Sequence, residues 1–114
     1  MAENNSQKEI SKPCFGDHCH TFWILSKAKP QVIRAIITNA EPALLRHFTE
    51  VALNCLQGKL ELTEEERQNL KPKTRDLKKL ACFTSKAPRR RLLLKRGNCK
   101  LVRNLAKFAV RINQ

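Results

Sequence analysis

The chain has 114 residues, enough for one compact domain, and its 23 lysines and arginines against 10 aspartates and glutamates give a net charge of +13. Aromatic residues make up only 5% of the chain and tyrosine is absent, so aliphatic side chains must build the core, which favours helices over sheets. Apolar runs are short, and the five cysteines are irregularly spaced. We therefore expect a soluble intracellular protein without a transmembrane segment or a disulfide framework.

The positive charge is concentrated in the last part of the chain. Residues 1–57 carry 6 basic and 5 acidic side chains, residues 58–70 carry 2 and 4, and residues 71–114 carry 15 and 1. Such crowding raises the energy of the compact state by self-repulsion, which a partner of opposite sign relieves. Nucleic acid fits that description best, and an anionic membrane surface comes second.

Residues 1–29 are predicted to form a leader, polar up to residue 13 and then rich in cysteine, histidine and aromatic side chains. Its run Phe22-Trp23-Ile24-Leu25 is expected to dock on the core. Pro30 is predicted to open a first helix and Pro42 a second, because proline suits the first helical position. Gly58 then supplies the left-handed residue that ends the second helix.

The remaining helices follow from capping signals. Thr63 and Glu66 have capping-box spacing, so a third helix is predicted from about Glu64, and Lys71-Pro72 interrupts it before a fourth that ends near Phe83. A fifth helix is expected from Ser85 to Gly97 and a sixth, capped by Asn98, to the C-terminus. The predicted fold is all-α, a compact bundle of about five to six short helices, with residues 30–83 as the helical core and residues 84–114 as a basic helical C-terminal region.

The basic side chains of the C-terminal region are the main functional candidates. In the last helix Lys100, Arg103, Lys107 and Arg111 lie within an arc of about 80° on one face, opposite an apolar face. A solvated charged face normally mixes signs, whereas no acidic residue follows Asp76. Phosphate contacts, with little base preference, are predicted for Arg89, Arg90, Arg91, Lys95, Arg96, Lys100, Arg103, Lys107, Arg111, Lys78 and Lys79.

Metal binding and catalysis have weaker sequence support. Cys14, His18, Cys19 and His20 are the one possible zinc set, but their spacing departs from standard zinc sites, and a partly packed lid with incidental cysteine and histidine is preferred. We expect no metal and no cofactor. The chain has no glycine-rich phosphate loop and no nucleophile motif, and His47 is expected to be a surface or half-buried side chain. We therefore expect no enzymatic activity.

The run Ala52-Leu53-Asn54-Cys55-Leu56-Gln57-Gly58 is similar to the signature Ala-Leu-Asn-Val-Leu-x-Gly of a known family. The stretch from Lys73 to Leu80 is similar to that family's Lys-x-x-Leu-x-x-Leu helix, and a basic stretch from Ser85 to Leu94 follows. Residues 27–97 thus resemble a small family of basic proteins from Polinton-like (Maverick) elements and adintoviruses. Family members continue with a Gly-Gly pair and an apolar tail, where this chain has Gly97-Asn98 and a basic amphipathic helix. The resemblance implies a structural protein that packs DNA, similar to a virion core or minor capsid component.

These observations predict a non-enzymatic nucleic-acid-binding protein, DNA-condensing or virion-core-like, in the host nucleus or the virion. DNA is the expected partner, and a capsid protein is a second one. Two other classes stay open at this point. One is a capsid or scaffold module whose basic arm binds an acidic protein, and the other is a membrane-surface protein that uses its basic amphipathic helix.

Overall fold

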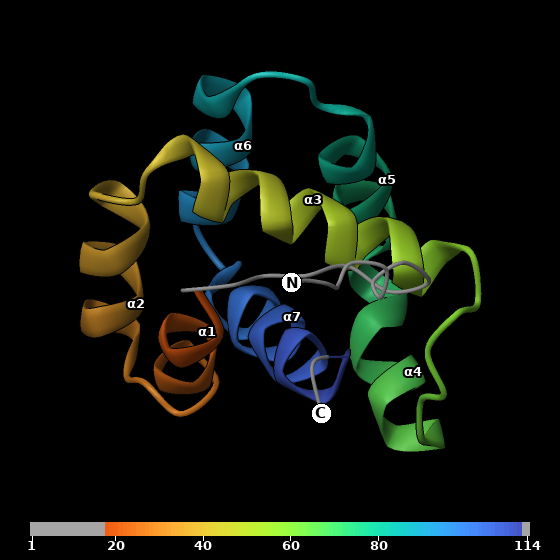
Figure 1. The fold of residues 1–114 in the computed structure, drawn as a ribbon. Coiled ribbons are helices and arrows are strands. Elements are labelled where there is room, and N and C mark those ends of the chain that lie inside the picture. The colour runs from red at the N-terminus through yellow and green to blue at the C-terminus, as the bar shows by residue number, and fades with distance from the viewer. Residues whose placement is uncertain (1–17, 113–114) are drawn as a thin grey trace, which may run out of the picture.

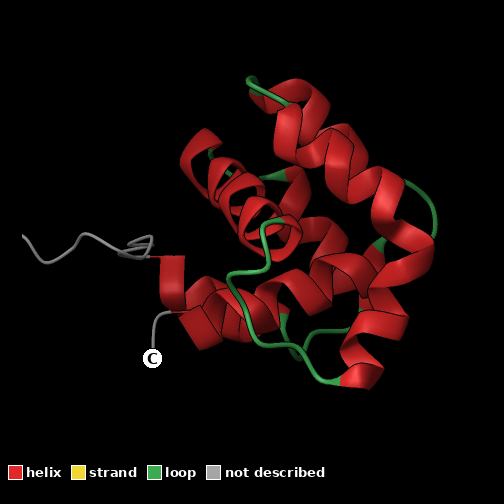
Figure 2. Cartoon of the chain, turned by 90° about the vertical axis from the view of Figure 1, so that its right-hand side faces the viewer, coloured by secondary structure: helices red, strands yellow, loops and turns green. Residues whose placement is uncertain are grey.

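The chain folds into a helical bundle in the computed structural model, which describes residues 18–112 (Figure 1). No strand occurs in that range, as Figure 2 shows, and the predicted all-α bundle is confirmed. The elements are α1 (Cys19–Leu25), α2 (Pro30–Thr38), α3 (Pro42–Leu56), α4 (Glu64–Leu70), a 3-10 turn η3 (Lys71–Lys73), α5 (Thr74–Cys82), α6 (Lys86–Leu94) and α7 (Cys99–Ile112).

Local chemistry sets several helix boundaries as predicted. Pro30 and Pro42 occupy the first positions of α2 and α3. At the start of α4 the Thr63 hydroxyl accepts from the Glu66 amide at 3.1 Å, and the Glu66 carboxylate accepts from the Thr63 amide at 2.9 Å. Gly58 after α3 has a φ of 71°, in the left-handed region that glycine adopts without steric cost.

The core is aliphatic with a few phenylalanines, and α3 and α7 contribute the largest shares of it. In Figure 1, α3 crosses the bundle, and it packs against α5, α6 and α7, while α1 packs against α7. Phe22 of α1 and Phe48 of α3 are fully buried, with ring centroids 5.1 Å apart. The buried set runs from Phe22 to Ile112 and so includes side chains of the predicted leader and of the predicted C-terminal region.

The Phe22-to-Leu25 run docks only in part. Phe22 and Leu25 are fully buried, whereas Trp23 is 49% exposed and Ile24 39% exposed. A helix of seven residues offers one face to the bundle, and positions three apart share that face. The expected docking of the whole run is therefore limited to its first and last residues.

Asn98 does not play the predicted capping role with its side chain. It is fully buried, donates to Asp76 Oδ2 at 3.2 Å and to the Leu92 carbonyl at 2.9 Å, and accepts from Lys73 Nζ at 2.8 Å. Gly97, with a φ of 87°, turns the chain so that this side chain points inward. Asn98 thus joins α5 to the turn between α6 and α7.

The apolar face of α7 is used inside the bundle. Its buried residues are Leu101, Val102, Leu105, Ala106, Phe108, Ala109 and Ile112. Within residues 18–112 no helix has the length and apolar character that crossing a bilayer requires. The amphipathic pattern of α7 is therefore explained by packing against α1, α2, α3 and α6.

Candidate nucleic-acid interface

Four arginines predicted to contact phosphates instead hold the fold together, and Arg90 is the clearest case. Its guanidinium donates to the Ile37 carbonyl at 3.3 Å and to the Ala40 carbonyl, both at the C-terminal end of α2. In return Arg34 of α2 donates to the carbonyl of Leu94, the last residue of α6, at 3.0 Å. The last carbonyls of a helix lack internal partners and carry partial negative charge, so guanidinium groups stabilise them.

Arg89 is buried, with 9% of its surface exposed. It donates to the carbonyl of Phe83, the residue that follows α5, at 2.8 Å. Its Nε has no hydrogen-bond partner in the part of the chain that the structure describes. Burial, together with the nearby charge of Arg46, lowers the pKa of Arg89 from its ordinary value. Arg89 is a structural contact between α6 and α5 rather than a surface cation.

The four basic side chains on one face of α7 have different environments. Arg103 donates to the Ala28 carbonyl, in the turn between α1 and α2, at 2.8 Å. Arg111 forms a bidentate ion pair with Glu66, at 2.7 and 3.2 Å, and also donates to the Glu61 carbonyl. The hydrogen bond from Arg111 lowers the pKa of Glu66 from its ordinary value. Lys100, which precedes Arg103, and Lys107, which lies between the two arginines, stay exposed.

A buried polar network lies beneath the cations of α5 and α6. Asp76, 8% exposed at its side chain, accepts from Asn98 and forms an ion pair with Lys95 at 3.4 Å. Burial raises the pKa of Asp76, but hydrogen bonds from Asn98 and Lys95, with the charges of Lys95 and Lys73, outweigh that effect and lower it overall. The one acidic side chain of residues 71–114 is thus already paired.

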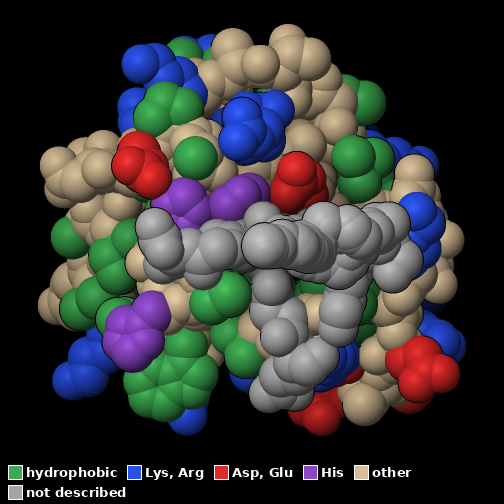
Figure 3. Space-filling view, in the orientation of Figure 1, with side chains coloured by type: hydrophobic (Ala, Val, Ile, Leu, Met, Phe, Trp, Pro, Cys, Tyr) green, Lys and Arg blue, Asp and Glu red, His purple; other side chains and the backbone are tan. Residues whose placement is uncertain are grey.

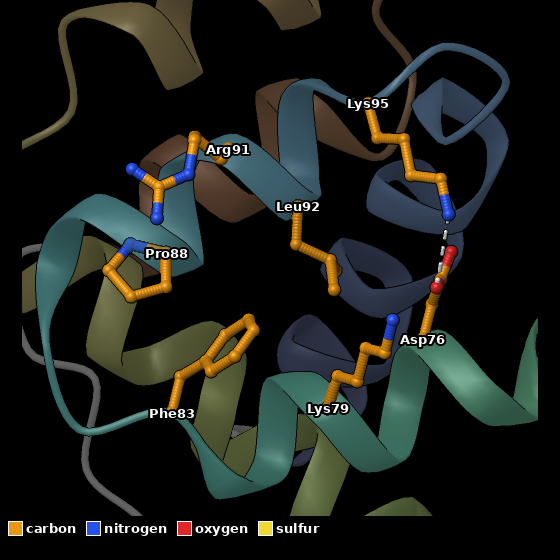
Figure 4. A pocket seen from close by; sticks show the side chains of 7 residues that line it. All are labelled: Asp76, Lys79, Phe83, Pro88, Arg91, Leu92 and Lys95. Atoms are coloured by element: carbon orange, nitrogen blue, oxygen red, sulfur yellow. Dashed lines mark hydrogen bonds and ion pairs between the residues drawn. The ribbon is translucent and has the colours of Figure 1, made fainter.

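Basic side chains line an open groove between α5 and α6, which we call the α5–α6 groove. Lys79, Arg91 and Lys95 line it, with Phe83, Pro88 and Leu92 as its apolar part and Asp76 at one end, and its volume is about 480 Å³. Figure 4 shows Leu92 pointing between the two helices, Lys79 reaching up from α5, and Lys95 directed to Asp76. Lys79 and Arg91 are exposed and have no hydrogen-bond or ion-pair partner within residues 18–112.

A second hollow lies on the other side of the Asp76 network. It has a volume of about 200 Å³, and its lining includes Lys73, Gly97, Lys100 and Asn104. Lys73, which lines this hollow, bonds to Asn98, and Lys95, which lines the α5–α6 groove, bonds to Asp76, so one side chain of each hollow belongs to the same network. We define the cationic band as the side chains that line either hollow: Lys73, Lys79, Arg91, Lys95 and Lys100.

The structure brings only some of the predicted phosphate-contacting residues together. The cationic band contains four of the predicted contacts: Lys79, Arg91, Lys95 and Lys100. It also contains Lys73, which is not among the predicted contacts. The predicted Lys78, Arg96 and Lys107 are exposed but line neither hollow. Arg89, Arg90, Arg103 and Arg111 are bonded to carbonyls of other segments.

The possible zinc set, Cys14, His18, Cys19 and His20, lies only in part within the described residues. Cys14 lies outside the described residues, and His20 is exposed and stacks on Trp23 with ring centroids 6.3 Å apart. His18 instead contacts His47, Nδ1 to Nδ1 at 3.1 Å, and donates from Nε2 to Glu41 at 2.7 Å. Within residues 18–112, no group of three or more histidine, cysteine, aspartate or glutamate side chains converges on one point suited to a metal ion.

His47 lies deeper than the sequence indicated. It is 8% exposed, and burial, with the nearby charges of His18 and Arg46, lowers its pKa to about 4. Figure 3 shows histidine side chains touching on this face, with acidic side chains beside them. No sequence signal links His47 to His18, because 29 positions separate them.

Residues 18–112 form a compact all-α bundle, and the cationic band lines its two hollows. No family model, no curated protein and no solved structure matches this chain. The resemblance to the basic proteins of Polinton-like elements therefore stays a prediction that rests on the motifs in residues 27–97.

Proposed function

We propose that this chain is a non-enzymatic nucleic-acid-binding protein that contacts the phosphate backbone through the cationic band. One observation carries the proposal. Lys79, Arg91 and Lys95 line one open groove, and the nearest carboxylate, Asp76, is already bonded to Lys95 and Asn98. Cations gathered without matching anions attract a polyanion and release its counterions on binding.

The distribution of charge over the bundle supports this choice of face. The acidic first turn of α4, Glu64 to Glu66, lies beside the C-terminal end of α7 through the ion pair of Glu66 with Arg111. Glu66 thus already neutralises Arg111 at that end of α7, whereas Lys100, in the first turn of α7, lies in the cationic band. We therefore place the phosphate contacts over α5, α6 and the beginning of α7, with Lys78 and Arg96 as flanking contacts.

The resemblance in residues 27–97 supports DNA as the partner. A protein related to core or minor capsid components condenses DNA with little sequence preference, in the virion or in the host nucleus, and a capsid protein is then a second partner. The membrane-surface alternative has less support, because the bundle already covers the apolar face of α7. The remaining alternative, an acidic protein partner, is distinguished by experiment.

The test is fluorescence anisotropy with a labelled DNA duplex and with single-stranded DNA and RNA of equal length, between 50 and 200 mM salt. Five phosphate contacts predict that duplex affinity falls by about 10²- to 10³-fold over that range. The double variant Lys79→Glu, Arg91→Glu should bind more weakly and reduce the slope of log K against log salt by about 2.

The matched control is Lys29→Glu, Lys59→Glu, which changes the net charge equally at exposed lysines outside the cationic band. It should keep most of the slope. Equal losses in both double variants would refute the band as the site. Failure of the wild-type chain to bind any of the three nucleic acids at low salt would refute the function and favour an acidic protein partner.

A further inference from the structure

The pair formed by His18 and His47 has a geometry that neither its local sequence nor the proposed function explains. His18 precedes α1 and His47 lies in α3, and their Nδ1 atoms approach to 3.1 Å. Glu41, which precedes α3, accepts from the other nitrogen of His18 at 2.7 Å. Three segments of the chain thus meet at two imidazole rings and one carboxylate.

We propose that His18 and His47 bind one divalent transition metal ion, of the zinc, nickel or cobalt class, through their Nδ1 atoms. A tetrahedral zinc ion holds nitrogen ligands at 2.0–2.1 Å, so two such nitrogens lie about 3.3 Å apart. The observed separation of 3.1 Å is within a few tenths of an ångström of that value. A small rotation of either ring opens the space for the ion, and water fills its other positions.

The hydrogen bond to Glu41 prepares His18 for this role. Because Nε2 of His18 donates to the carboxylate, the neutral ring keeps its lone pair on Nδ1, the atom that faces His47. Metal-bound histidines commonly donate their second nitrogen to a carboxylate in this way, which fixes the tautomer and makes the ring a better ligand. Glu41 is therefore a positioning residue, and its negative charge partly balances the ion.

His47 supplies the second lone pair in its Nε2–H tautomer. In the metal-free protein the neutral His47 ring carries its one proton on Nδ1 and donates it to Nδ1 of His18. When the ion binds, His47 changes tautomer: that proton leaves Nδ1 for water, and Nε2 of the same ring takes one up, so both rings stay neutral and both Nδ1 lone pairs face the ion. The positive charge of Arg46 repels the ion, but its side chain is exposed, so solvent screens this repulsion.

The site is reachable from solvent and its occupation has a structural consequence. The His18 side chain is 16% exposed and the Glu41 side chain 66% exposed, so the ion enters past Glu41. Once bound, it links the beginning of α1 to α3. Binding to the folded state alone then raises the thermal midpoint with the logarithm of the metal concentration.

Cobalt(II) titration of the reduced full-length chain, followed by absorption spectroscopy, tests the proposal. We expect saturation at one equivalent with visible d–d bands and no thiolate-to-cobalt charge-transfer band, because both protein ligands are imidazoles. Zinc added afterwards should displace the cobalt. A thiolate band at the first equivalent would assign the metal to a cysteine such as Cys19 and overturn the proposal.

Variants separate this pair from other histidines of the chain. His18→Ala and His47→Gln should each abolish the saturable bands, and Glu41→Ala should weaken cobalt binding by about 10- to 100-fold. His20→Ala is the matched control, because His20 is exposed in the first turn of α1, two residues after His18, and its ring contact is with Trp23 rather than with the pair. Circular dichroism confirms that each variant is folded. Unchanged binding in a folded His18→Ala chain, or equal losses in His20→Ala, would overturn the assignment.

Discussion

The Asn98 side chain gives the largest single-residue effect that the structure predicts outside the apolar core. Asn98→Ala removes three hydrogen bonds, to Lys73, Asp76 and the Leu92 carbonyl, from a position with no solvent exposure. Water cannot replace the lost donor at the Leu92 carbonyl without opening the turn. A buried group left unsatisfied costs about 1–3 kcal/mol, so we expect a loss of about 2–4 kcal/mol in the free energy of unfolding.

Urea denaturation followed by far-ultraviolet circular dichroism measures this loss at pH 7. The midpoint should fall while the m-value stays unchanged, because the surface exposed on unfolding is nearly the same. Asn39→Ala is the control, since Asn39 is exposed and donates only to the Ala35 carbonyl of its own helix, and it should change stability by less than about 0.5 kcal/mol. A loss below about 1 kcal/mol for Asn98→Ala would refute the idea that this network holds the α6–α7 turn in place.

Three further predictions concern other parts of the fold. Burial raises the pKa of Asp76, but its hydrogen bonds with Asn98 and Lys95 outweigh this and lower it below the ordinary value of an aspartate. The stability that this gives is present above the ordinary pKa and is lost as the pH falls below it, and Asp76→Asn should flatten that decline of the urea midpoint. Burial raises the pKa of Cys55 to about 12, so timed alkylation with mass spectrometry should modify the exposed Cys82 first; equal rates would contradict this. Gly58→Ala should cost about 1 kcal/mol because φ is 71°, and an unchanged urea midpoint would contradict this.

Helix boundaries were predictable because they depend on residues close in sequence. Proline at the first helical position located α2 and α3, and the spacing of Thr63 and Glu66 located the start of α4. These signals act within a single turn of helix and need no knowledge of the tertiary structure. The all-α class followed from the same local rules and from the scarcity of aromatic side chains.

The role of individual arginines was not predictable by the same means. A helical wheel places Arg103 and Arg111 on one face, but it cannot tell which carbonyl of another segment lies opposite that face. Ala28 is 75 positions from Arg103, and Glu61 is 50 from Arg111. Which cations stay free for a ligand therefore depends on the packing of helix ends, which no local pattern encodes.

The histidines show the same limit. Sequence proximity grouped His18 with Cys14, Cys19 and His20, whereas its side-chain partners in the fold are Glu41 and His47, 23 and 29 positions away.

The internal use of arginine has a consequence for how this surface can be modified. Within residues 18–112, the cationic side chains that donate to main-chain carbonyls are all arginines: Arg34, Arg89, Arg90, Arg103 and Arg111. The cationic band, apart from Arg91, consists of lysines. Acetyl groups transfer to lysine amines and remove their charge, but leave guanidinium groups unchanged. Acetylation of Lys79 and Lys100 would therefore remove exposed positive charge and leave the hydrogen bonds of the arginines in place. The affinity for a polyanion is thus adjustable without unfolding the bundle.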